Sequence, residues 1–166
     1  MTRTRKKLLR LAVAGLKAYP DEALPIYESL NSLPSLTSSF GYNVPSTGNW
    51  EAAYDIWLNS TSIEVMVWTD TAGDVSPAVS SIGDVTLNGS TWDVYVGNVG
   101  HPVYSLVRTS NETQGSVNLL GILDWLENTK GYYFNPTLST VDFGWEISST
   151  GDVQEDYTVW AYSVSD

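Results

Sequence analysis

The chain of 166 residues contains no cysteine and only one histidine, His101. The absence of cysteine excludes disulfides and thiolate metal sites. A single histidine excludes a zinc centre built from several histidines and the metal-binding H-E-x-x-H helix. No run reaches the roughly 18 apolar residues that a membrane-spanning helix needs. The sequence therefore predicts no metal, no other cofactor and no membrane partner.

Basic residues are scarce and unevenly placed. Eight Lys and Arg stand against 19 Asp and Glu, which gives a net charge of −11. Six of the eight lie before residue 18, so the remainder of the chain carries only Arg108 and Lys130. Such an acidic body repels phosphate backbones, which disfavours nucleic acid as a partner. It also fits an extracellular, secreted protein.

The basic start of the chain, residues 1–17, is predicted to be an extension that precedes a single domain of residues 18–166. Residues 3–7 resemble the charged start of a signal peptide, and residues 8–16 resemble its apolar stretch, but Arg10 interrupts that stretch. Two interpretations stay open. The extension is either a degraded or misplaced signal peptide, or an irregular or helical segment.

Most of the remaining sequence alternates between apolar and polar residues with a period of two, which is typical of strands. The dipeptide Asn88-Gly89 favours a type I′ hairpin, and Asn59-Ser60-Thr61 joins another pair of strands tightly. Strands are predicted over residues 35–43, 50–58, 62–69, 85–87, 91–97, 103–109, 138–149 and 157–164.

One segment, residues 116–130, has helical spacing instead. Ser116 is the predicted N-cap and Gly131 the predicted residue after the last turn. An amphipathic helix must lay its apolar stripe against a sheet. The sequence therefore predicts an all-β fold, an antiparallel β-jelly-roll sandwich with one amphipathic helix on its convex side.

The strand at 62–69 carries unusual residues on its outward face. Three aliphatic residues alternate with Glu64, Met66 and Trp68. An acid between a thioether and an indole suits a sugar cleft, because an indole stacks on the apolar face of a pyranose. The alternative is an ordinary strand face whose side chains pack under a loop.

The preceding strand adds a second acid. If residues 50–58 pair with 62–69, Trp57 lies opposite Glu64, and Asp55 lies opposite Met66 and diagonal to Glu64. Neighbouring carboxylates are costly unless one of them holds a proton. Functional sites tolerate that cost more often than structural faces do.

A further acid of interest, Glu146, lies near the C-terminus. Asp142, Gly144 and Glu146 alternate with three apolar residues, Phe143, Trp145 and Ile147. Gly144 is predicted to leave room beside Glu146 for a ligand. The alternative is a strand bulge with an exposed glutamate.

These segments resemble a known family. A-Y-D-I-W-L at 53–58 and I-E-V-M-V-W at 63–68 resemble the paired central strands of glycoside hydrolase family 12, which comprises β-1,4-glucanases and xyloglucanases with a β-jelly-roll fold. The similarity continues through 83–87, 91–95, the helix and F-G-W-E at 143–146. It covers about residues 18–165, and the family's first strands have no match, so the chain is expected to be short at its N-terminal end.

The resemblance implies a retaining mechanism and assigns roles. Glu64 matches the nucleophile, Glu146 the general acid/base and Asp55 the acid that donates a hydrogen bond to the nucleophile. Retention needs two carboxyls about 5–5.5 Å apart, and Glu146 must stay protonated near the working pH. The residues expected to bind substrate are Trp57, Met66, Trp68, Trp145 and Asn98.

The leading hypothesis is thus a monomeric, endo-acting hydrolase that acts on β-glucan polysaccharides without a cofactor. Two alternatives remain open: a non-catalytic carbohydrate-binding jelly roll, and an inactive truncated homologue. His101 is predicted to be a loop residue without a catalytic role. Tyr132 and Tyr133 are expected to pack against strands rather than line the cleft.

Overall fold

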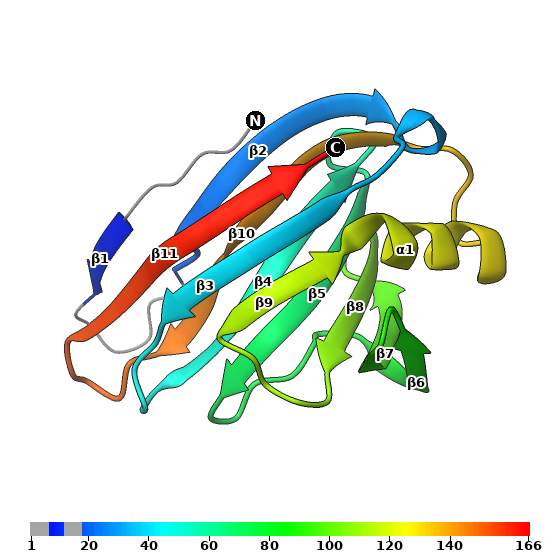
Figure 1. Cartoon of the computed structure of the whole chain (residues 1–166). Helices are drawn as coiled ribbons and strands as arrows, with labels where there is room; N and C mark the ends of the chain where they lie inside the picture. The colour runs from blue at the N-terminus through cyan, green and yellow to red at the C-terminus, as the bar shows by residue number, and fades with distance from the viewer. Residues whose placement is uncertain (1–6, 12–17) are drawn as a thin grey trace.

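The computed structural model describes residues 7–11 and 18–166, which form two stacked sheets (Figure 1). One sheet has four strands in the order β1 (Lys7–Leu11), β11 (Glu155–Ser165), β3 (Thr37–Asn43) and β9 (Gln114–Asn118). The other has seven, in the order β2 (Asp21–Ser29), β10 (Thr137–Ser149), β4 (Asn49–Leu58), β5 (Ile63–Ala72), β8 (Pro102–Arg108), β7 (Ser90–Asn98) and β6 (Ser80–Leu87). The predicted all-β sandwich is confirmed.

The core lies between the two sheets and is rich in aromatic rings. Phe143 of β10 packs on Tyr54 of β4, with ring centroids 4.8 Å apart. It also stacks on Phe40 of β3 at 5.8 Å and packs at a tilt against Tyr42 of the same strand at 5.7 Å. Each of these rings alternates with a residue that points away from the core, because successive side chains on a strand face opposite sides. This alternation leaves the other face of the seven-stranded sheet free for polar side chains.

The register between β4 and β5 is the one that the sequence predicts. Asp55 pairs with Met66, and Trp57 pairs with Glu64. The connecting turn uses Asn59 and Ser60 with positive φ values of 51° and 65°. Asn88 and Gly89 likewise have positive φ between β6 and β7, as a type I′ hairpin requires.

Three strands are absent from the prediction. The acidic, proline-containing β2 lies at the edge of the seven-stranded sheet, where a proline is tolerated. The short β9 lies at the edge of the other sheet. The third, β1, lies in the basic start and pairs with β11, so an irregular or helical structure is wrong for residues 7–11. The predictions for residues 1–6 and 12–17 lie outside the described residues.

The sheet also departs from a purely antiparallel arrangement at one place. Strand β8 lies between β5 and β7, and it runs parallel to β5 with Glu64 opposite Val103. The hairpin of β6 and β7 lies between β5 and β8 in the sequence, and this connection allows the parallel pairing. Consequently the turn that precedes β8 ends beside the start of β5.

The helix begins later than predicted. It comprises α1 (Leu119–Asp124) and a π-helical turn, η2 (Trp125–Thr129). Asn118 caps it by accepting a hydrogen bond from the Gly121 N–H at 2.9 Å, so the prediction of Ser116 as N-cap is wrong and Ser116 lies in β9. Gly131 follows the last turn with a φ of 67°, and its N–H donates to the Glu127 carbonyl. Its predicted place is confirmed.

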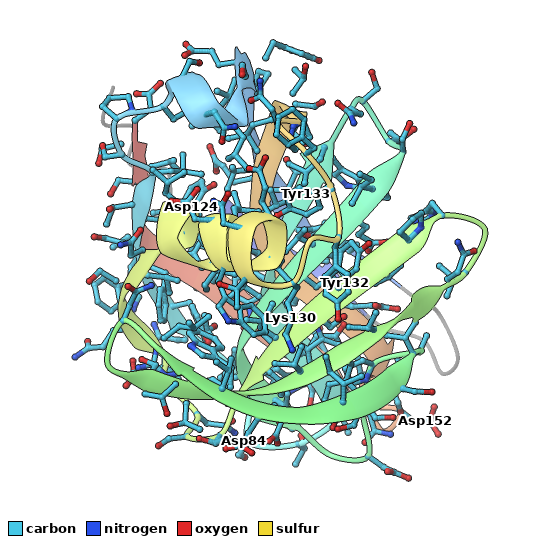
Figure 2. All side chains as sticks on the ribbon, turned by 90° about the vertical axis from the view of Figure 1, so that its right-hand side faces the viewer. Asp84, Asp124, Lys130, Tyr132, Tyr133 and Asp152 are labelled. Carbon is cyan, nitrogen blue, oxygen red and sulfur yellow. The ribbon has the colours of Figure 1, made fainter. Side chains whose placement is uncertain are left out.

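The helix packs on the side of the seven-stranded sheet that faces the core, as predicted. Tyr104 of β8 is paired with Val65 and stacks on Tyr132, with ring centroids 4.7 Å apart. Tyr133 donates a hydrogen bond to the Leu123 carbonyl, and both tyrosines lie beside the helix in Figure 2. They pack against the helix and β8 rather than line a cleft. In residues 7–11 and 18–166, no helix has the length and apolar character to span a membrane.

Candidate active site

The predicted catalytic carboxylates lie on the open face of the seven-stranded sheet. Glu64 and Met66 of β5 and Glu146 of β10 together line a cavity of about 330 Å³. The same three residues, with Asp55 and Tyr19, line an adjoining cavity of about 310 Å³. Residues 82 positions apart in the sequence therefore meet in one groove.

The groove runs diagonally across three strands. Glu64 is paired with Trp57 on β4, whereas Glu146 is paired with Glu51 farther along the same strand. Trp68 of β5 and residues 74–78 also line the groove. The predicted position of Trp68 beside Glu64 and Met66 is therefore seen in the structure.

Glu51 is a third glutamate in the groove that the sequence analysis missed. It lines the same cavity as Glu64 and Glu146 and is only 3% exposed. A sequence signal was present, because Glu51 has the same strand parity as Asp55 and Trp57.

Asp55 is the carboxyl with the largest resolved perturbation. Burial, followed by the negative charges of Glu64 and Asp142, raises the pKa of Asp55 to about 8, and a hydrogen bond from the Trp57 side chain opposes the shift. Its Oδ1 is buried without a hydrogen-bond partner. Asp55 therefore carries a proton at neutral pH, which it can donate to an oxygen in the groove.

Two neighbours extend this acidic cluster. Burial and the charge of Asp21 raise the pKa of Asp142, the partner of Asp55 on β10, to about 6. Burial, followed by the charges of Asp55 and Asp142, raises the pKa of the Tyr19 hydroxyl well above its usual range. Because these groups disfavour each other's ionisation, the region around Asp55 holds protons more tightly than an exposed acidic surface would.

Glu64 has a partner that the sequence analysis did not predict. His101 Nε2 lies 2.6 Å from Glu64 Oε2, and the two side chains are 29% and 14% exposed. His101 does lie in a loop, as predicted, in the turn between β7 and β8. No local pattern reveals this contact, because it depends on the parallel pairing of β8 with β5.

The other predicted binding residues lie in different surroundings. Trp57 is half-buried, contacts the His101 ring at 5.2 Å between centroids and hydrogen-bonds Asp55. Asn98 is exposed, and its Oδ1 accepts a hydrogen bond from the Gly100 N–H at 2.9 Å. Neither residue is among those that line the two cavities. Both instead support the residues around Glu64.

Two predictions about β10 are wrong. Trp145 does not face the groove, since it is 4% exposed in the core against Tyr42 and Tyr157. Strand alternation already grouped it with the core residues, and the assignment to substrate went against that alternation. Gly144 makes no room for a ligand, because a Cβ there would collide with the backbone of Pro20 and Asp21.

A separate hollow of about 260 Å³ lies between β2 and β11. It is lined by Glu22, Pro25 and Tyr162 among others, and it contains none of the predicted catalytic carboxylates. The chemistry that the sequence predicts therefore belongs to the groove of Glu64 and Glu146.

The chain is similar to known proteins over most of its length. The profile of Glycosyl hydrolase family 12 matches residues 12–165. The chain belongs to this family. Among solved structures, the chain is similar to the xyloglucanase domain of NopAA, a type three effector from Sinorhizobium fredii, in complex with cellobiose. That structure is 32% identical with a TM-score of 0.88, over 96% of this chain and 81% of the other.

Two curated relatives are named as glucanases. Endoglucanase S of Pectobacterium parmentieri is 34% identical over 87% of this chain and 59% of its own length. The xyloglucan-specific endo-beta-1,4-glucanase A of Emericella nidulans is 31% identical over 92% of this chain and 67% of its own. The chain thus spans about three fifths to two thirds of the length of these two relatives.

Proposed function

We propose that the protein hydrolyses internal β-1,4 linkages of a glucan, with retention of configuration at the anomeric carbon. The observation that carries the proposal is the meeting of Glu64 and Glu146 in one groove beside a protonated Asp55. The names of the two relatives, endoglucanase and xyloglucan-specific endo-β-1,4-glucanase, support a β-1,4-glucan as the substrate class. The cellobiose complex of the Sinorhizobium domain supports the same class.

In the first step, an oxygen of Glu64 attacks the anomeric carbon while Glu146 donates its proton to the glycosidic oxygen. The carbon–oxygen bond to the leaving sugar breaks, and a covalent glycosyl-enzyme forms on Glu64. Glu64 must be ionised for this attack. The proton on Asp55 supports that state, because a neutral neighbour does not repel the carboxylate of Glu64 and can donate a hydrogen bond to it.

In the second step, Glu146 is a carboxylate and takes a proton from an incoming water molecule. The water oxygen bonds to the anomeric carbon, and the bond to Glu64 breaks with its electrons returning to the carboxylate. Met66 and Trp68 line the groove beside Glu64 and provide apolar surface for the sugar rings.

Rescue by azide tests both the reaction and its stereochemistry. Glu146→Ala should cleave an activated aryl β-cellobioside slowly at the second step, because the water molecule has lost its base. Added azide needs no base and should restore turnover with a β-glycosyl azide as product. An α-glycosyl azide, identified by NMR, would contradict retention, and the absence of any rescue would remove Glu146 from the acid/base role.

A non-catalytic carbohydrate-binding protein is the second candidate. One relative, of Phytophthora nicotianae, is named Inactive glycoside hydrolase XLP1 and is 28% identical over 93% of this chain. Release of reducing sugar from carboxymethylcellulose, barley glucan and xyloglucan separates the two functions. A binding protein would retain affinity for one of these glucans and release nothing.

A further inference from the structure

Among residues 18–166, His101 stands out because it is the one basic side chain that contacts the proposed nucleophile. From residue 18 onward the chain has only two other basic side chains, Arg108 and Lys130. Arg108 pairs with Glu112 and lies over the Trp92 ring. Lys130 lies over the Trp125 ring. In an acidic body with so few cations, the contact of His101 with Glu64 calls for a specific explanation.

The backbone holds His101 in place independently of Glu64. The Val99 N–H donates to the His101 carbonyl at 3.0 Å, and the Asn98 side chain accepts from the Gly100 N–H. Gly100 has a φ of 113°, a conformation that side chains with a Cβ rarely adopt. Pro102 directly follows His101 and begins β8, which runs beside β5. The turn is therefore shaped locally and presents the imidazole to the start of β5.

Trp57 fixes the ring from the other side. The indole and imidazole centroids lie 5.2 Å apart with the planes inclined by 51°. Trp57 is itself held, because it pairs with Glu64 across the strands and its side chain hydrogen-bonds Asp55. His101 Nε2 is thus directed at one oxygen of Glu64 by a structured turn and a structured indole.

We propose that His101 is a positioning residue for Glu64: its Nε2–H holds Oε2, directs Oε1 at the anomeric carbon and stabilises the carboxylate as it leaves. This inference rests on the proposed function. In the glycosyl-enzyme, Oε1 is bonded to the sugar and Oε2 is an ester carbonyl. An ester carbonyl accepts a weaker hydrogen bond than a carboxylate does.

The contact therefore strengthens as the second step proceeds. Water adds to the anomeric carbon and gives its proton to Glu146, while the electrons of the breaking carbon–Oε1 bond return to Glu64. A donor at Oε2 stabilises that developing charge, as preorganised donors do at other developing anions. In the first step the hydrogen bond from His101 to Oε2 weakens instead, because the charge on Glu64 is lost. The donor therefore assists deglycosylation specifically.

Two variants separate the effect of the Nε2–H donor from the effect of the aromatic ring. His101→Phe keeps an aromatic ring against Trp57 but lacks the donor, whereas His101→Gln places an amide N–H near the position of Nε2. With an activated aryl β-cellobioside, His101→Phe should lower the steady-state rate by about tenfold or more and enlarge the burst of released phenol. His101→Gln should recover most of the steady-state rate. Equal rates for His101→Phe and wild type, or equal losses in both variants, would overturn the proposal.

A spectroscopic measurement tests the contact without reference to activity. The chain has one histidine, so a ¹H–¹⁵N spectrum of the imidazole contains signals of His101 alone. The Nε2–H signal should lie downfield in the wild type and move upfield in Glu64→Gln, while the exposed control Glu28→Gln leaves it unchanged. An Nε2–H signal with the same chemical shift in Glu64→Gln as in the wild type would refute the positioning role. If the wild type released no sugar but the signal moved, the proposed function would fail, together with the catalytic part of the role of His101, and the contact alone would stand.

Discussion

The two faces of β4, β5 and β10 differ sharply although they alternate residue by residue. On the core face, Tyr54 is fully buried and its hydroxyl donates to Ser38 Oγ at 2.9 Å. On the groove face, the adjacent Asp55 is also largely buried, yet its Oδ1 has no hydrogen-bond partner and its pKa is raised to about 8. The Tyr54 hydroxyl on the core face is thus paired, whereas Asp55 on the groove face keeps an unpaired oxygen and a raised pKa.

This difference indicates what each face is selected for. Buried polar groups are normally paired, because an unpaired one costs free energy. A face that tolerates clustered acids and an unpaired oxygen instead keeps donors and acceptors available for a substrate. Substitutions on the core face should therefore lower stability. Those on the groove face should lower activity or change how stability depends on pH.

The largest effect is expected from Glu64→Gln on the groove face. Glutamine keeps the shape of the side chain and cannot form the glycosyl ester. Turnover of barley glucan should therefore fall about ten-thousandfold or more, while the unfolding temperature and glucan binding stay close to those of the wild type. Reducing-sugar release, thermal unfolding and affinity electrophoresis measure the three quantities.

The control for this substitution is Glu28→Gln, which removes a carboxylate from the exposed end of β2. Its turnover should equal that of the wild type. If Glu64→Gln turned over glucan at a rate comparable to that of Glu28→Gln, Glu64 would not be the nucleophile and the proposed mechanism in the groove would be wrong.

The next effect is expected from Phe143→Ala on the core face. Phe143 is 1% exposed and contacts Phe40, Tyr42, Tyr54 and Tyr162. Removal of its ring should leave a cavity and lower the free energy of unfolding by about 3–5 kcal/mol. Urea denaturation measures this loss, and kcat at a temperature where the variant is folded should change little. A large loss of kcat in the folded variant would mean that the two faces are not independent.

The sequence was sufficient to predict the parts of the site that depend on strand alternation. The period of two placed Glu64, Met66 and Trp68 on one face, and the short turn at Asn59 set the register that brings Trp57 opposite Glu64. These are local properties, because a single turn fixes the pairing of the two strands that it joins.

The contacts that were missed depend on distant parts of the chain. His101 reaches Glu64 because β8 pairs in parallel with β5 after an intervening hairpin, and no local pattern encodes that choice of neighbour. Gly144 likewise meets the backbone of Pro20 and Asp21, which lie more than a hundred residues earlier. Strand β2 was missed for a compositional reason, since its acids and Pro25 disfavour a strand except at an edge.

The smallest of these effects, and the one that best separates the two faces, is expected from Asp55→Asn. Because the pKa of Asp55 is raised to about 8 in the folded protein, the folded state holds a proton that the unfolded chain releases near pH 4. The stabilising contribution of this protonated carboxyl is complete below about pH 4 and is lost as the pH rises to about 8. Asparagine has no proton to release and should remove this dependence.

The free energies of unfolding of the wild type and Asp55→Asn should therefore diverge between pH 5 and pH 7. The wild type should become less stable relative to the variant by up to about 3 kcal/mol, since each pH unit contributes at most about 1.4 kcal/mol. Urea denaturation at both pH values measures the difference, and Asp84→Asn, which removes an exposed carboxylate from β6 (Figure 2), is the matched control. Parallel curves for the wild type and Asp55→Asn would mean that Asp55 is ionised in the groove. It could then not donate the hydrogen bond that supports Glu64.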